Sequence, residues 1–82
     1  MEEKIRKFIV AAQRNEITEH FIYMKLAESS KDLRNAEVLR KIGEQEKSHA
    51  EFWQTKSGQV VEPDRFRIFR TVFLARILGL TF

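Results

Sequence analysis

The sequence lacks cysteine, and it holds only 3 glycines and 1 proline among its 82 residues. Without cysteine the chain forms no disulfide and offers neither a thiolate metal ligand nor a cysteine nucleophile. The few glycines leave no glycine-rich phosphate loop. The sequence also has no uncharged apolar run of the roughly 18 residues that a membrane-spanning helix needs. These absences exclude disulfide-stapled, thiol-dependent, P-loop and membrane-spanning designs.

What is present indicates one small ordered domain. Hydrophobic residues make up 43% of the chain and charged residues 33%, a balance typical of a folded protein. A chain this short buries only about 60% of the surface that its unfolded form exposes. We therefore expect a metal ion or a partner chain to supply part of its stability.

Apolar residues recur at helical spacing through three segments, which predicts an all-α fold. The predicted helices cover about residues 2–29, 33–56 and 64–82, within a single domain spanning 1–82. Asp32 or Asn35 suits the start of the second helix, and Gly58 suits its end. We expect the first two helices to form an antiparallel hairpin, followed by the shorter third helix.

The third segment is apolar and basic at once. We expect its apolar residues to share one side, and these are Phe66, Phe69, Phe73, Ile77 and Leu80. Residues 62–82 hold four arginines and two acidic residues. The arginines fit a solvated face, a membrane surface or, least well, a nucleic acid. Because no stop signal follows the apolar run, we expect the chain to end inside a longer element.

The informative residues are polar groups that fall on the apolar stripes. The stripe of the first helix reaches Glu16, and that of the second reaches Glu46 and His49. A buried carboxylate is costly unless it is paired or binds a metal. A Glu and a His three residues apart share one helix face and can bind one ion. The alternatives are a solvated Glu16, or a metal-free hydrogen-bonded pair of Glu46 and His49.

In this arrangement the sequence resembles the ferritin-like superfamily, specifically rubrerythrin-type di-iron domains. The motif is Glu16, then Tyr23 seven residues on, then Glu46-Lys47-Ser48-His49 on the next helix. Within that superfamily the chain is similar to the branch associated with vacuolar-iron-transporter (Ccc1-type) proteins. The residues that carry this closer similarity are 15–20, 26–27, 44–53 and 74–82.

The resemblance implies a four-helix bundle of which this chain holds half. Each half of a di-iron bundle supplies one Glu and one Glu-x-x-His pair. One chain offers Glu16, Glu46 and His49, so two chains together offer four Glu and two His. We therefore expect a homodimer or a higher even oligomer that completes the bundle around the site.

Further residues near the stripe have open roles. Glu19 lies one turn from Glu16 and is a candidate additional ligand, with His20 a weaker one. Tyr23 hydrogen-bonds and orients a ligand carboxylate, acts as a redox-active phenol, or simply packs.

The resulting expectation is a ferritin-like protein that binds iron at a di-metal site, two metals per dimer, and oxidises Fe(II). Manganese or zinc would suit the same ligands. The alternative is a non-catalytic helical oligomerisation module, or a metal-sensing domain of an iron transporter. By resemblance a membrane transporter domain is a partner, and nucleic acid is not. The expected location is cytoplasmic, including the cytoplasmic face of a membrane.

Overall fold

The computed structural model describes residues 1–79, and the all-helical prediction is confirmed over them. The three helices are α1 (Glu3–Ser29), α2 (Leu33–Ser57) and α3 (Arg65–Ile77), with no strand between them. No helix in this part of the chain is long and apolar enough to cross a membrane.

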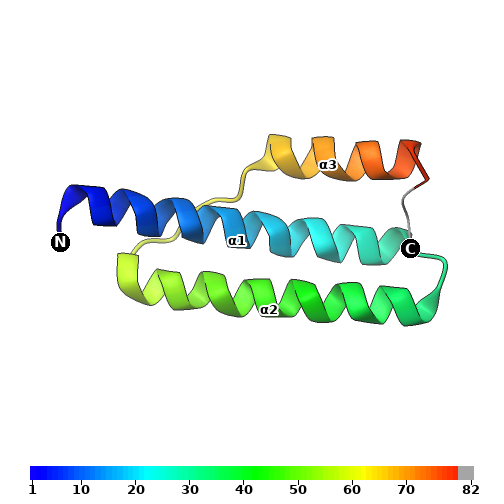
Figure 1. Cartoon of the computed structure of the whole chain (residues 1–82), viewed down its shortest axis with the longest axis horizontal. Coiled ribbons are helices and arrows are strands. Elements are labelled where there is room, and N and C mark those ends of the chain that lie inside the picture. Colours follow the sequence, from blue (N-terminus) through cyan, green and yellow to red (C-terminus); the bar gives the residue numbers. More distant parts are fainter. Residues whose placement is uncertain (80–82) are drawn as a thin grey trace.

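The helices lie in a row, with α1 in the middle (Figure 1). α2 runs antiparallel to α1 on one side, and α3 lies along the other side. Within residues 1–79, α3 contacts α1 and not α2. The Cα atoms span 45 × 22 × 14 Å. Most domains bury their apolar surface between at least two layers, and several large apolar side chains stay exposed here, among them Phe8, Phe52 and Phe66.

Side-chain and glycine caps set the helix boundaries. The Asp32 carboxylate accepts hydrogen bonds from the backbone N–H groups of Arg34 and Asn35, which begins α2. Gly58 ends α2 in the left-handed conformation, with φ of 69°, that other residues rarely adopt. The Asp64 side chain accepts from the Arg67 N–H and begins α3.

The third helix is shorter than predicted. It ends at Ile77, and Gly79 turns the chain with a φ of 69°, whereas the sequence predicted a helix through residue 82. The left-handed glycine interrupts the helical path although the apolar pattern continues. Residues 80–82, including Leu80 of the predicted stripe, lie outside the described part of the chain.

The core lies where the three helices come together around α1. The buried cluster consists of Ile22, Leu26, Ala27, Leu39, Ile68 and Val72. Gly43 lets α2 approach α1 closely, because an added Cβ would lie 3.0 Å from the Met24 Sδ.

The predicted apolar side of α3 faces away from this core. Ile68 and Val72 are buried against α1, whereas Phe66, Phe69, Phe73 and Ile77 are exposed. The helix is apolar on both sides, so its periodicity did not show which side would pack. The stripe of α1 has a similar exception, because Ile5 and Phe8 are also exposed.

Hydrogen bonds of buried polar side chains on α1 hold the connection between α2 and α3 against that helix. The Gln13 Nε2 donates to the Gln59 carbonyl over 2.8 Å, and the Ser57 hydroxyl donates to the Gln13 Oε1 over 2.7 Å. The Asp64 N–H donates to the Thr18 Oγ1 over 2.9 Å. These bonds fix where α3 begins relative to α1.

Candidate metal centre

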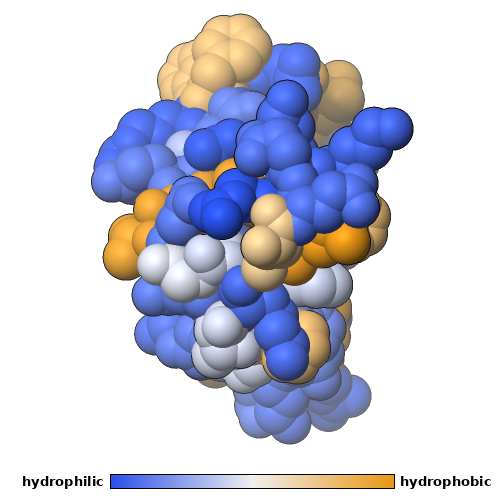
Figure 2. Space-filling view, turned by 90° about the vertical axis from the view of Figure 1, so that its left-hand side faces the viewer, coloured by the Kyte–Doolittle hydropathy of each residue, from blue (hydrophilic) through white to orange (hydrophobic). Residues whose placement is uncertain are grey.

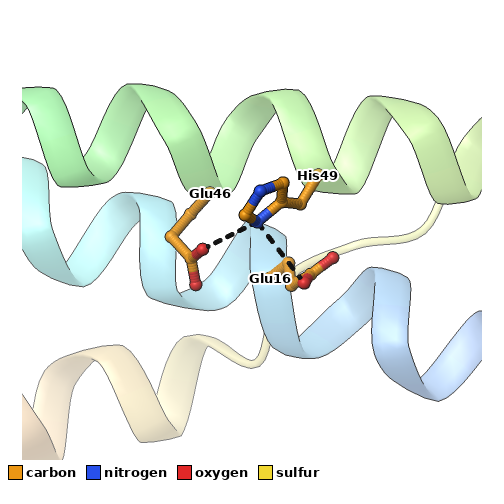
Figure 3. A group of neighbouring side chains, drawn as sticks. All are labelled: Glu16, Glu46 and His49. Atoms are coloured by element: carbon orange, nitrogen blue, oxygen red, sulfur yellow. Dashed lines mark hydrogen bonds and ion pairs between the residues drawn. The ribbon is translucent and has the colours of Figure 1, made fainter.

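Three potential metal ligands meet between the middles of α1 and α2 (Figure 3). Glu16 projects from α1, and Glu46 and His49 project from α2. The His49 Nδ1 lies 3.1 Å from the Glu46 Oε1 and 3.7 Å from the Glu16 Oε1. The structure therefore brings together the three residues that the sequence singled out as principal ligands.

The spacing of these atoms suits a metal ion. Two ligands that each bind one ion at about 2.1 Å lie at most about 4.2 Å apart. The two nitrogen-to-oxygen distances already satisfy that bound, and one ligand atom from each residue lies within 4.8 Å of the others. Small side-chain rotations would close the set around one ion. Two carboxylates and one imidazole suit iron, manganese or zinc.

One oxygen in the site has no protein partner. The Glu16 Oε2 is buried and makes no hydrogen bond within the described residues. Burying a polar atom without a hydrogen-bond partner costs desolvation free energy, and most buried polar atoms in folded proteins do have a partner. The side chains of Glu16 and Glu46 are 22% and 16% exposed, whereas that of His49 is 58% exposed. The two carboxylates are thus held inside, and the imidazole covers them from an open face.

A third carboxylate adjoins the site. A hydrogen bond with Glu46 is the largest effect that raises the pKa of Glu19, followed by burial and by repulsion from the Glu46 charge. Arg67 opposes the shift in that pKa. Glu19 thus lies beside a candidate ligand.

Arg67 connects this carboxylate to α3. Its Nη2 lies 3.4 Å from the Glu19 Oε1, and its Nη1 donates to the Asn15 Oδ1 over 2.6 Å. Its own N–H is bonded to the Asp64 cap. Arg67 was missed as a site residue in the sequence, where it was one of four arginines on a basic helix. Its sequence distance from Glu19 left no periodic signal that could have found it.

The remaining candidates lie outside the ligand group. Tyr23 packs against the buried cluster around Ile22 and Leu26. The His20 Nδ1 lies 2.8 Å from the Gly43 carbonyl oxygen, which can only accept, so the imidazole donates and links α1 to α2. His20 therefore has a structural role here.

Comparison with family models, curated proteins and solved structures gives no match. The case for a metal centre therefore rests on the three ligands, their spacing and the unpaired oxygen. The resemblance of the motif to ferritin-like proteins contributes a hypothesis about function, which we take up next.

Proposed function

We propose that this chain binds iron or manganese at Glu16, Glu46 and His49, as ferritin-like proteins do. The observation that carries the proposal is the Glu16 Oε2, a buried carboxylate oxygen without a hydrogen-bond donor beside another carboxylate and an imidazole. Two carboxylates repel each other in the protein interior, and a divalent cation between them would remove that repulsion.

The ligand set of one chain is incomplete for two metals, and a second copy would complete it. Two chains would supply four Glu and two His, the inventory of a di-iron carboxylate bundle. The large apolar side chains that stay exposed, among them Phe8, Phe52 and Phe66, support this arrangement, since a second layer of helices would cover part of such a surface. In this proposal the chain is half of a four-helix bundle, and a two-fold axis passes near the metal ligands.

Each side chain has a distinct part in such a site. Glu16 and Glu46 would provide the negative charge, and His49 would bind through a ring nitrogen that carries no proton. When bound, iron supplies one-electron chemistry with oxygen, and Fe(II) oxidation is the reaction we propose.

Native mass spectrometry during anaerobic titration with Fe(II) tests binding and oligomeric state together. We expect two metal ions on a dimer, lost in Glu46→Ala and in His49→Ala. Glu44→Ala and Glu51→Ala remove exposed carboxylates from the same helix and should bind as the unmodified chain does. A chain that stays monomeric and metal-free throughout the titration would overturn the proposal.

Oxygen consumption distinguishes the reaction from binding alone. We expect the metal-loaded protein to consume oxygen when Fe(II) is added, and Glu46→Ala to abolish the excess over free Fe(II). Binding without oxygen consumption would instead favour a structural or sensing site, the non-catalytic alternative. Zinc bound in place of iron would give the same result.

A further inference from the structure

The outer side of α3 is an apolar strip on which no other helix of residues 1–79 packs. The strip consists of Phe66, Phe69, Phe73 and Ile77, which are 70%, 64%, 49% and 62% exposed. The opposite side of the same helix buries Ile68 and Val72 against α1. A helix with apolar side chains on two opposite sides is typical of one that packs against something on both sides. The outer strip therefore indicates a second surface that α3 contacts.

Basic residues border the strip along its length. The exposed arginines of α3 are Arg65, Arg70 and Arg76, and α3 has no acidic residue. The Arg70 guanidinium lies over the Phe66 ring at 5.7 Å, and the Arg76 Nε donates to the Ser29 hydroxyl. Arg65 lies 3.6 Å from Glu62 in a pair whose side chains are 81% and 77% exposed. These weak exposed contacts leave the guanidinium charge largely available to an external anion.

A groove extends the strip toward α1. It has a volume of about 560 Å³, and it lies between Phe69 and Phe73 of α3 and Phe21 of α1. Lys25, Arg65 and Arg76 line its margins, with Glu62 as its one carboxylate. Apolar walls with a cationic margin suit an amphiphile with an apolar tail and an anionic head.

We propose that α3 docks on the surface of an anionic lipid bilayer. The phenylalanines would enter the boundary between headgroups and acyl chains, the arginines would contact lipid phosphates, and the groove would take an acyl chain. Charge decides against a second copy as the occupant, because two α3 helices packed face to face would oppose arginine to arginine. α3 forms the outermost edge of the row of helices, so a flat surface can reach its whole length (Figure 1).

The proposed docking surface is separate from the candidate metal centre. The ligands lie between α1 and α2, on the far side of α1 from the outer edge of α3 (Figure 1). In the end-on view, apolar side chains stand out at the α3 edge beside hydrophilic ones (Figure 2). A lipid-bound chain would therefore keep its metal ligands accessible, and the inference does not depend on the proposed function.

Vesicle co-sedimentation of the full chain tests the proposal. We expect binding to vesicles of phosphatidylcholine mixed with phosphatidylglycerol, weakening as salt rises, and little binding to phosphatidylcholine alone. The double variant Arg65→Gln/Arg70→Gln should bind roughly 30-fold more weakly, since each basic residue near an anionic surface contributes on the order of a fivefold factor. Arg34→Gln/Arg40→Gln removes the same charge from exposed positions on α2 and should keep most of the binding.

A second double variant tests the apolar strip. Phe69→Ser/Phe73→Ser changes exposed rings, so helicity should be unchanged while vesicle binding falls. Absence of binding to anionic vesicles would overturn the proposal. Equal losses in the α2 and α3 arginine variants would also overturn it, because net charge alone would then explain the attraction. If the phenylalanine variant instead dissociates an oligomer without altering vesicle binding, a second copy covers the strip and the lipid proposal is wrong.

Discussion

Two sets of polar side chains alternate along the middle of α1, and they differ in how their hydrogen bonds are met. Gln13 and Thr18 are buried, and each bonds to the segment that joins α2 to α3. Glu16, between them in sequence, faces Glu46 and His49 and keeps one buried oxygen without a donor. Gln13, Glu16 and Thr18 lie within six positions of α1.

This difference separates polar residues whose hydrogen bonds hold the fold together from polar residues that could bind a ligand. The hydrogen bonds of Gln13 and Thr18 bridge more than 40 positions of sequence, so these residues fix the course of the chain. The Glu46 Oε1 lies 3.1 Å from the His49 Nδ1, whereas the Glu16 Oε2 has no hydrogen-bond partner among the described residues, and the two carboxylates repel each other. Burial of a polar group is thus informative only together with an account of its hydrogen bonds.

The largest expected effect is stabilisation of the fold by metal. Mn(II) at 100 times its dissociation constant should raise the free energy of unfolding by about 2.7 kcal/mol. That corresponds to a rise in Tm of roughly 10 °C or more for a domain of this size. Differential scanning calorimetry measures it. Thr18→Val should keep the rise and Glu46→Ala should lose it, whereas equal rises in both variants would erase the distinction between the two sets.

The next largest effect concerns the hydrogen bond between the Thr18 hydroxyl on α1 and the Asp64 N–H. Thr18→Val should lower the free energy of unfolding by about 1–3 kcal/mol, because the Asp64 N–H loses its acceptor. Urea unfolding of the metal-free protein measures the change. Thr55→Val, at an exposed position on α2, is the matched control and should change stability little. A Thr18→Val variant as stable as that control would show that the hydrogen bond between Thr18 and Asp64 contributes nothing to stability.

Substitution of Glu16 should change the stability of the metal-free protein in the opposite direction to Thr18→Val. Glu16→Met removes the unpaired oxygen and the repulsion from Glu46, so the free energy of unfolding should rise by on the order of 1 kcal/mol. The same variant should no longer be stabilised by Mn(II). Parallel urea titrations with and without metal test both statements. Destabilisation as large as that of Thr18→Val would place Glu16 among the structural residues.

The smallest effect is a dependence on pH. The folded-state pKa of Glu19 is raised, chiefly by its hydrogen bond with Glu46, so the folded state binds this proton more tightly than the unfolded state. Stability of the metal-free protein should therefore fall as pH rises through the folded-state pKa of Glu19. Urea midpoints across the acidic to neutral range measure the slope. Glu19→Gln should flatten it, and Glu44→Gln, at an exposed carboxylate, should leave it unchanged.

The features of the fold that depend on local sequence pattern could be predicted. Helical periodicity, the Asp32 cap and Gly58 are properties of neighbouring residues, and they set the helices. Glu16, Glu46 and His49 were identifiable because each lies on an apolar stripe. The packing side of α3 was not identifiable, since phenylalanines on one side and Ile68 and Val72 on the other make equally apolar patterns.

Contacts between distant segments were also beyond the sequence. Thr18 accepts from Asp64, and Arg67 reaches Glu19, across more than 40 positions of chain. These pairs form because α3 lies along α1, and tertiary packing determines that position. Thr18 and Gln13 interrupt apolar stretches, but polar residues in a helix are common and indicate no partner.

The row of three helices also sets an order in which the molecule opens. α1 is contacted on both sides, whereas within residues 1–79 α3 contacts α1 and not α2, through a short buried contact and the hydrogen bonds at its start. Local opening requires less free energy where fewer buried contacts break. Amide protons of α3 should therefore exchange with solvent before those of α1. Each such opening carries Arg67 away from Glu19 while α1 and α2 stay paired, so the charge around the Glu46 carboxylate fluctuates with the motion of a helix that contributes no ligand.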